Sequence, residues 1–248
     1  MRHALFAAIL LLPGLAGAHR DFVEPSALAG IEIYDRSDHR TLPIHQFKGR
    51  LYVAGEPGHQ YEIRLRNRSS ERLLVVTSVD GVNVISGQTA KTAQSGYVLS
   101  PWDSVEIDGW RKSMDEVATF YFTRLSNSYA ARTGRPENVG VIGVAVFRER
   151  QRCCRPHYLE ERAASAPAEP QARDEASARD KLGTGHGHRE TSPVEYVDFQ
   201  RASSTPDETI IIYYDSTKNL LARGVIPEPG KYADRRPNPF PNEFVPDP

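Results

Sequence analysis

Hydrophobic and polar residues alternate along much of the chain, and this alternation predicts β-strands. Tyr61, Ile63 and Leu65 are separated from one another by charged residues. A period of two places one face of a strand in a core and the other face in water. Shorter apolar runs predict further strands over residues 31–34, 51–53, 97–99, 105–107 and 117–123.

A β-hairpin is predicted where two β-branched runs meet at an Asp-Gly pair. Residues 73–79 form the first run, Asp80 and Gly81 the turn, and residues 82–85 the second run. Asp-Gly suits a type I′ turn, because both central residues of that turn need a positive φ.

The nearly continuous apolar run over residues 139–147 predicts a central strand, with Gly140 and Gly143 allowing a bulge or close packing. Later in the chain, we expect strands over residues 194–199 and 209–214, the second pairing with residues 220–226. No helical period is long enough for a βαβ unit. The pattern therefore predicts an all-β fold, an antiparallel β-sandwich of immunoglobulin-like or jelly-roll-like character.

The N-terminus has the features of a secretory signal peptide. Arg2 and His3 precede an apolar run over residues 4–12, and small residues occupy positions 16–18. Cleavage after residue 18 would make His19 the mature N-terminus. The apolar run is too short to span a bilayer, and no later uncharged run is longer, so we expect no transmembrane span. The expected location is periplasmic or extracellular.

Composition divides the rest of the chain. We expect a sandwich core with an N-terminal lead-in over residues 19–159, and returning strands that complete the sandwich over residues 183–226. Residues 160–182 are rich in Ala, Glu, Arg, Ser and Pro, which predicts a disordered insertion. Residues 227–248 are rich in Pro and predict an extended tail.

Charge and cysteine content exclude two classes of protein. The chain has 31 Lys and Arg against 32 Asp and Glu, so it lacks the basic excess of a nucleic-acid-binding protein. Its two cysteines, Cys153 and Cys154, are adjacent, which excludes a disulfide-stapled scaffold. With His157 they could bind a soft metal or form a vicinal disulfide. Exposed or disulfide-linked thiols without a catalytic role are the favoured interpretation.

Several short segments resemble a group of uncharacterised exported bacterial proteins. The resemblance covers roughly 100 residues and implies a compact domain with a later returning segment. It assigns no activity and no catalytic residue. The segments that carry it are residues 61–63, 78–84, 96–99, 109–111, 138–143 and 183–187.

Histidines offer two candidate metal sites. The α-amine and imidazole of His19 could chelate Cu(II), with a second histidine completing the site. The candidate second ligands are His39, His45, His59, His186 and His188. The alternative is that cleavage merely precedes a histidine on a mobile terminus.

His186 and His188 form the second candidate. In an extended segment both imidazoles point to one side, which Glu190 would share. The alternative is a glycine-rich hinge with solvated histidines.

Other candidate residues have simpler explanations. Asp80 and Asp108 each precede Gly and suit turns, and no two carboxylates can be paired from the sequence. The scattered carboxylates are Asp80, Asp103, Asp108, Asp115 and Glu116. An aromatic platform for a sugar could involve Trp102, Trp110, Tyr97 and Tyr129. Core packing is the favoured role for such tryptophans, although Trp102 follows Pro101 and is expected in a loop.

The absence of a nucleophile motif or a phosphate-binding loop favours a non-enzymatic function. The sequence predicts an exported binding or assembly-support module, whose partner would be an envelope or extracellular protein or a glycan. Its partner-accepting edges are expected at residues 194–199 and 209–214. The alternative is a copper-binding or copper-dependent redox protein that uses His19.

Overall fold

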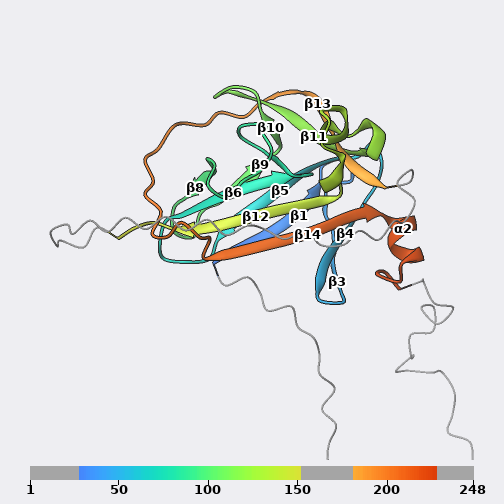
Figure 1. The fold of residues 1–248 in the computed structure, drawn as a ribbon, viewed down its shortest axis with the longest axis horizontal. Helices are drawn as coiled ribbons and strands as arrows, with labels where there is room; N and C mark the ends of the chain where they lie inside the picture. The colour runs from blue at the N-terminus through green and yellow to red at the C-terminus, as the bar shows by residue number, and fades with distance from the viewer. Residues whose placement is uncertain (1–27, 152–180, 228–248) are drawn as a thin grey trace, which may run out of the picture.

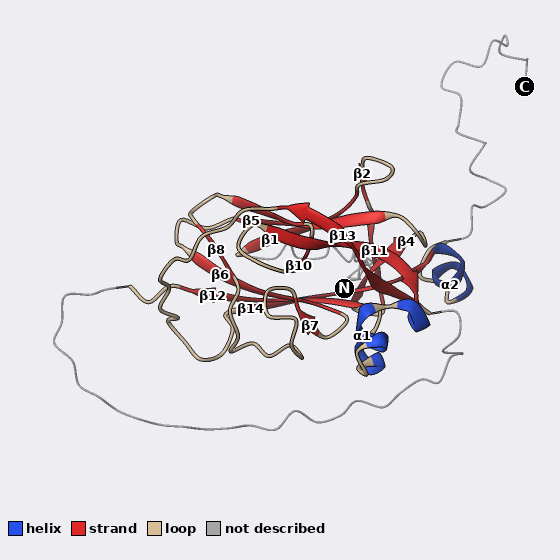
Figure 2. Cartoon of the chain, turned by 90° about the horizontal axis from the view of Figure 1, so that it is seen from above, coloured by secondary structure: helices blue, strands red, loops and turns tan. Residues whose placement is uncertain are grey.

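The computed structural model describes residues 28–151 and 181–227. Two seven-stranded sheets pack face to face and form a β-sandwich, which confirms the predicted all-β class. Figure 2 shows the sheets as two layers, with the short helices at one end. Several predictions fall outside the described residues: the signal peptide and His19, the adjacent cysteines with His157, the insertion up to residue 180, and the proline-rich tail beyond residue 227.

The first sheet has the order β10-β11-β5-β1-β2, with β13 also pairing with β11 and β9 with β5. Its strands are β1 (Ala29–Asp35), β2 (Arg40–Thr41), β5 (Gln60–Asn67), β9 (Ser104–Ile107), β10 (Gly109–Arg111), β11 (Glu116–Arg124) and β13 (Leu182–Thr191).

The second sheet has the order β3-β4-β14-β12-β6-β7, with β8 also pairing with β6. Its strands are β3 (Ile44–Phe47), β4 (Arg50–Gly55), β6 (Leu73–Val79), β7 (Val82–Asn83), β8 (Tyr97–Leu99), β12 (Val141–Arg148) and β14 (Glu208–Ser216). Short helices follow at α1 (Tyr129–Arg132) and α2 (Thr217–Ala222), with 3₁₀ turns at Leu125–Asn127 and Pro136–Asn138.

Alternating residues of both sheets meet in a closed core. Ile63 and Phe120 of the first sheet and Val144 and Ile212 of the second are at most 1% exposed. The predicted hairpin is present, because Asp80 and Gly81 have φ values of 54° and 71° between β6 and β7. β12 lies between β14 and β6, so the prediction of a central strand is confirmed.

β14 departs from the predicted arrangement in two ways. It pairs in parallel with β4, whereas the other strand pairs within the described residues are antiparallel. It also pairs with β12 on its other side. The prediction that residues 209–214 form an open edge is therefore wrong.

Residues 220–226 were expected to form a strand, but the chain turns into α2 instead. The side chain of Ser216 accepts a hydrogen bond from the amide of Asn219 and caps the helix. Gly224, with a φ of 68°, follows the helix end. Leu220 and Val225 are buried beside Tyr52, so the apolar residues of this segment pack as a helix and its C-terminal turn.

Two other boundaries differ from the expectation. Leu182 was assigned to the insertion, but it is 2% exposed and begins β13. Residues 194–199 alternate in the sequence, yet they form no strand. They belong to a long connection, residues 192–207, that joins β13 of the first sheet to β14 of the second. We call this connection the strap; Figure 1 shows it as the orange arch that leaves β13 and returns at the far end of β14.

Candidate functional site

A groove of about 1370 Å³ lies beneath the strap. We call it the strap groove. Its lining comes from β8, from β9, from the turn after β10 and from the strap itself. β8 pairs with the beginning of β6, so the strap groove lies at that end of the second sheet.

Arg111 fixes the beginning of the strap. One of its Nη atoms donates to the carbonyl of Ser192 at 2.6 Å, and the other donates to the Ser192 hydroxyl at 3.2 Å. Its Nε donates to the hydroxyl of Tyr97 on β8 at 3.2 Å. The amide of Val194 also donates to the carbonyl of Met114. The strap is therefore attached to the turn after β10 at its start.

Two more arginines fix the strap further along. Arg72 donates to the carbonyl of Asp198 at 3.3 Å, and its guanidinium also pairs with Glu149 at 2.6 Å. Arg201 donates to the carbonyls of Thr92 and Gln94. Its guanidinium lies 4.3 Å from the ring centroid of Phe147.

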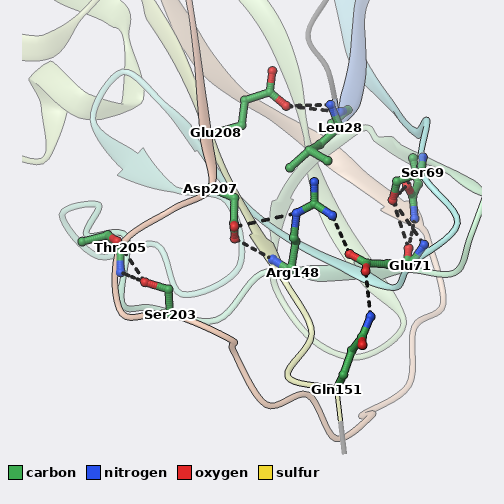
Figure 3. A network of polar contacts seen from close by, with 11 residues as sticks. Leu28, Ser69, Glu71, Arg148, Gln151, Ser203, Thr205, Asp207 and Glu208 are labelled. Carbon is green, nitrogen blue, oxygen red and sulfur yellow. Dashed lines mark hydrogen bonds and ion pairs between the residues drawn. The ribbon is translucent and has the colours of Figure 1, made fainter. Parts of the chain in front are cut away.

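The end of the strap is fixed by the polar network of Figure 3. The amide of Arg148 donates to Asp207 at 2.9 Å, and its guanidinium pairs with Glu71 at 2.6 Å. Gln151 donates to the other oxygen of Glu71 at 2.9 Å. The carboxylate of Glu208 accepts the amide of Leu28. The strap thus ends on β12, and Arg148 joins β12 to Glu71 in the turn before β6.

Between these attachments, the middle of the strap is exposed. Tyr196 is 92% exposed and Val197 is 52% exposed. No backbone hydrogen bond is found for residues 195–197, within the part of the chain that the structure describes. The strap is therefore held at both sides and left free over the strap groove.

The floor of the strap groove is apolar, with both aliphatic and aromatic side chains. Val98 and Phe199 are half-buried and pack against a small apolar cluster that includes Leu74 and Phe147. Val105 and Tyr97 are half-buried against the main core. The lining thus exposes part of several apolar side chains, which is typical of a binding site.

Two strand edges also line the strap groove. β8 pairs only with β6, and β9 pairs only with β5, among the described strands. Each therefore has one edge without a strand partner. The sequence had instead placed open edges at residues 194–199 and 209–214.

The charge of the strap groove is positive. Arg111 and Arg201 hydrogen-bond only to uncharged acceptors, and no carboxylate pairs with either within the described residues. Lys112 adds an exposed ammonium, while Asp103 and Glu195 are the acidic residues of the lining. A second hollow of about 740 Å³ adjoins the strap groove and shares Arg72 and Phe199 with it.

The predicted histidine pair on β13 does not form a shared ion site. Ala118 pairs with Arg189 and Phe120 with His186, so β13 has one extra residue between them. This bulge breaks the period of two. His186 turns toward the core, where its ring lies 6.3 Å from that of Trp110.

His188 lies on the outer side of the first sheet. It contacts Glu190 at 2.8 Å and Gln60 at 3.4 Å. The two imidazoles therefore point to opposite faces, and the expectation that both face one ion is wrong. Burial, together with the charge of Lys112, lowers the pKa of His186.

A cluster that the sequence did not reveal joins His59 to two aspartates. The ligand atoms of Asp35, Asp38 and His59 lie within 4.8 Å of one another. Asp35 already accepts the amides of Ser37 and Asp38 with one oxygen, and contacts His59 at 2.9 Å with the other. This hydrogen bond raises the pKa of His59. The cluster is explained as the closure of the turn after β1. Pairing between β1 and β5 brings these distant residues together, so no local sequence signal marks them.

The other candidate carboxylates have structural roles. Asp103 caps the start of β9 by accepting the Ser104 amide, and Glu116 pairs with Arg189 across two strands. Asp115 accepts the Ser192 amide with its backbone carbonyl. Asp108 accepts the amide of Phe120 in the same way.

Asp80 is fully buried and is the centre of a polar network between the sheets. Its carboxylate accepts the amides of Gly140 and Thr184 at 2.8 Å and the hydroxyl of Tyr214 at 2.5 Å. The Thr184 hydroxyl lies 2.6 Å from those of Tyr214 and Tyr61. Burial raises the pKa of Asp80 to about 6, against the opposing effect of its hydrogen bonds. The prediction of a turn residue was correct, but it did not reveal this network.

The predicted sugar platform is not assembled. Trp110 is 2% exposed and packs edge-on against Phe120 and beside Tyr129 in the core. Trp102 lies in the turn after β8, as expected, and is 61% exposed. Tyr97 lines the strap groove.

No helix of the described residues is long and apolar enough to cross a membrane. Comparison with protein-family models, with curated proteins and with solved structures gave no match.

Proposed function

We propose that this protein is an exported, non-enzymatic binding module that holds an extended segment of a partner polypeptide in the strap groove. The observation that carries the proposal is the strap groove itself, which combines an apolar floor with two open strand edges. Export is supported by the N-terminal sequence pattern alone.

The size of the strap groove favours a polymer segment over a small molecule. Its volume of about 1370 Å³ exceeds the range of roughly 300–1000 Å³ that is usual for small-ligand pockets. The adjoining hollow lengthens it past Arg72 and Phe199. A linear ligand could follow both.

The chemistry of the lining favours a polypeptide over a glycan. Besides the aromatic Tyr97, Tyr196 and Phe199, the lining offers the aliphatic surface of the half-buried Val98 and Val105, which suits the apolar side chains of a polypeptide. The free edges of β8 and β9 offer backbone donors and acceptors to a strand added beside them. The unpaired guanidinium charges of Arg111 and Arg201 favour a segment that carries carboxylates.

The test uses a fluorescein-labelled peptide of alternating Glu and Val, with a matched Lys-Val peptide as the charge control. An extended chain of this sequence presents apolar groups on one side and carboxylates on the other. We expect the Glu-Val peptide to raise fluorescence anisotropy on binding and the Lys-Val peptide not to do so. Failure of the Glu-Val peptide to bind at millimolar concentration would overturn the proposal.

Two variants place the binding in the strap groove. Val98→Glu introduces a charge into its floor, and Tyr196→Ala removes a fully exposed ring without disturbing the core. Both should weaken peptide binding by about tenfold. Ile211→Glu is the matched control, because Ile211 is 46% exposed and lies on β14 away from the lining. Equal binding by all three variants, or binding of an acidic polysaccharide in place of the peptide, would contradict the polypeptide assignment.

The copper alternative is supported by no observation within the described residues. His19 lies outside them, and His186 and His188 diverge. The role of His19 stays a prediction from the sequence.

A further inference from the structure

Trp102 occupies a backbone conformation that favours glycine. It is the second central residue of the turn between β8 and β9, in which the amide of Asp103 donates to the carbonyl of Ser100 at 3.2 Å. Pro101 occupies the first central position, and Trp102 has a φ of 65°. This combination is typical of a type II turn, whose second central residue is normally Gly or Asn.

The side chain of Trp102 makes no contact among the described residues that would stabilise the fold. The side chain is 61% exposed. It makes no hydrogen bond, ring contact or cation–π contact to any residue that the structure describes. A bulky side chain in the left-handed region costs about 1–2 kcal/mol relative to the usual backbone conformation. An exposed indole also leaves a large apolar surface in water.

The turn of Trp102 lies at the rim of the strap groove. Ser100 on one side of it, and Asp103 and Ser104 on the other, belong to the lining. The turn is held rigidly, because Asn67 donates from its side chain to the carbonyl of Ser100 at 2.9 Å and from its amide to the carbonyl of Asp103 at 2.8 Å. The rigid turn therefore fixes the backbone of Trp102 beside the strap groove, and its exposed indole extends from there.

We propose that Trp102 is a ligand-contacting residue, which packs its indole against an apolar side chain of the polypeptide segment bound in the strap groove. The inference rests on the proposed function. An indole offers a wide apolar face and one N–H donor, which suits an apolar side chain next to a backbone carbonyl. Exposed aromatic anchors of this kind dominate the affinity of many protein interfaces.

The experiment uses the Glu-Val peptide and the variants Trp102→Phe, Trp102→Ala and Trp102→Gly. We expect Trp102→Ala to weaken peptide binding about tenfold and Trp102→Phe to retain most of the affinity. Trp102→Gly should weaken binding as much as Trp102→Ala, yet it should melt at a higher temperature than Trp102→Ala, because glycine accepts a positive φ without strain.

Iodide quenching gives a second measurement on the unmodified chain. The chain has two tryptophans, of which Trp110 is buried and Trp102 is exposed, so iodide should quench Trp102 selectively. We expect the Glu-Val peptide to protect that fraction of the fluorescence. The Trp102→Phe variant should show no quenchable fraction, which assigns the signal.

The outcomes separate this inference from the proposed function. If the peptide binds the unmodified chain and Trp102→Ala equally well, and leaves iodide quenching unchanged, Trp102 does not contact the ligand, whereas the strap groove assignment stands. If Val98→Glu and Tyr196→Ala also leave peptide binding unchanged, the strap groove assignment fails as well.

Discussion

At the end of β6 the sandwich is closed by a buried polar network, whereas at the beginning of β6 the strap leaves it open. Asp80 directly follows β6 and is fully buried, and its carboxylate accepts three hydrogen bonds. At the other end, Arg111 and Arg201 donate to carbonyls of the strap and of nearby turns. Figure 1 places α2 at the first end and the arch of the strap at the second.

The comparison shows that buried and exposed polar groups have different structural roles in one sandwich. A buried carboxylate between the sheets is costly unless it is fully hydrogen-bonded, so the Asp80 network specifies one arrangement of four segments. The arginines are partly exposed, and their hydrogen bonds attach the strap to β10 and to the segment before β8. The closed end contributes stability, and the open end provides the candidate binding surface.

The largest expected effect is the loss of the Asp80 carboxylate. Asp80→Ala leaves the amides of Gly140 and Thr184 and the hydroxyl of Tyr214 without their acceptor, so we expect a loss of about 4 kcal/mol in the free energy of unfolding. Urea denaturation measures it. Asp103→Ala, in an exposed turn, is the control and should cost less than about 1 kcal/mol. Similar losses in the two variants would contradict the distinction between the two ends.

The second effect is a dependence of stability on pH. The folded pKa of Asp80 is about 6, above its unfolded value, so the fold prefers the protonated carboxyl. Its unfavourable contribution is present above about pH 6 and disappears as the pH falls toward 4. Relative to the protonated carboxyl, the ionised carboxylate of Asp80 lowers the stability of the fold by about 3 kcal/mol. His59, whose folded pKa is raised, contributes stability that is present below about pH 6.5 and is lost as the pH rises through its folded pKa.

Asp80 and His59 therefore favour the fold near pH 5 over pH 8, whereas His186, whose pKa is lowered mainly by burial, acts in the opposite direction below about pH 6.5. Denaturation at the two pH values measures the difference, and Asp80→Asn should remove the larger share of it. His59→Gln removes the smaller share. A pH dependence between pH 8 and pH 5 that is the same in Asp80→Asn as in the unmodified chain would contradict the assignment. Glu190 acts in the opposite direction, but Arg36 and His188 lower its pKa, against the effect of burial, so its contribution is lost only at more acid pH.

The same comparison shows what the sequence could predict. The hairpin at Asp80 and Gly81 depends on local backbone preferences, and the central position of β12 follows from its apolar run, so both were predicted correctly. Ser216 caps α2, and the prediction of a strand over residues 220–226 rested on the apolar residues of the segment and did not use this local signal. The parallel pairing of β14 with β4 depends on distant residues and left no local signal.

The candidate site was harder to predict for physical reasons. Residues 194–199 alternate like a strand. A strand, however, needs a neighbouring strand to share its backbone hydrogen bonds, and residues 195–197 have no backbone hydrogen-bond partner among the described residues. Opposite Thr119, β13 has two residues, Gly187 and His188, where regular pairing would have one, and the pattern of alternation alone does not reveal this bulge. The positive φ of Trp102 is visible only in the structure, although Pro101 favoured a turn.

A smaller effect is expected at the open end. Arg111→Ala removes the hydrogen bonds to Ser192 and Tyr97, whose partners can turn to water, so the loss should be about 1.5 kcal/mol. Hydrogen exchange should accelerate at the amide of Val194, which donates to Met114. Arg189→Ala breaks only an exposed ion pair and serves as the control. Unchanged exchange at Val194 in the Arg111 variant would show that the strap is held by other contacts.

The smallest effect is expected from shortening the chain between β12 and β13. Gln151 lies beside the strap groove, whereas Leu182 contacts Asp215 near the closed end, so the two described ends of this connection lie at opposite ends of the sandwich. β12 runs between the same two ends, and its residues rise about 3.3 Å each, so its length sets the distance that the connection must span. Deleting residues 160–175 leaves enough chain for the passage, and the free energy of unfolding should change by less than about 1 kcal/mol. Deleting residues 155–180 leaves too short a passage and should destabilise the protein strongly. If both deletions behave alike in urea denaturation, the two ends of this connection are not separated as the structure places them.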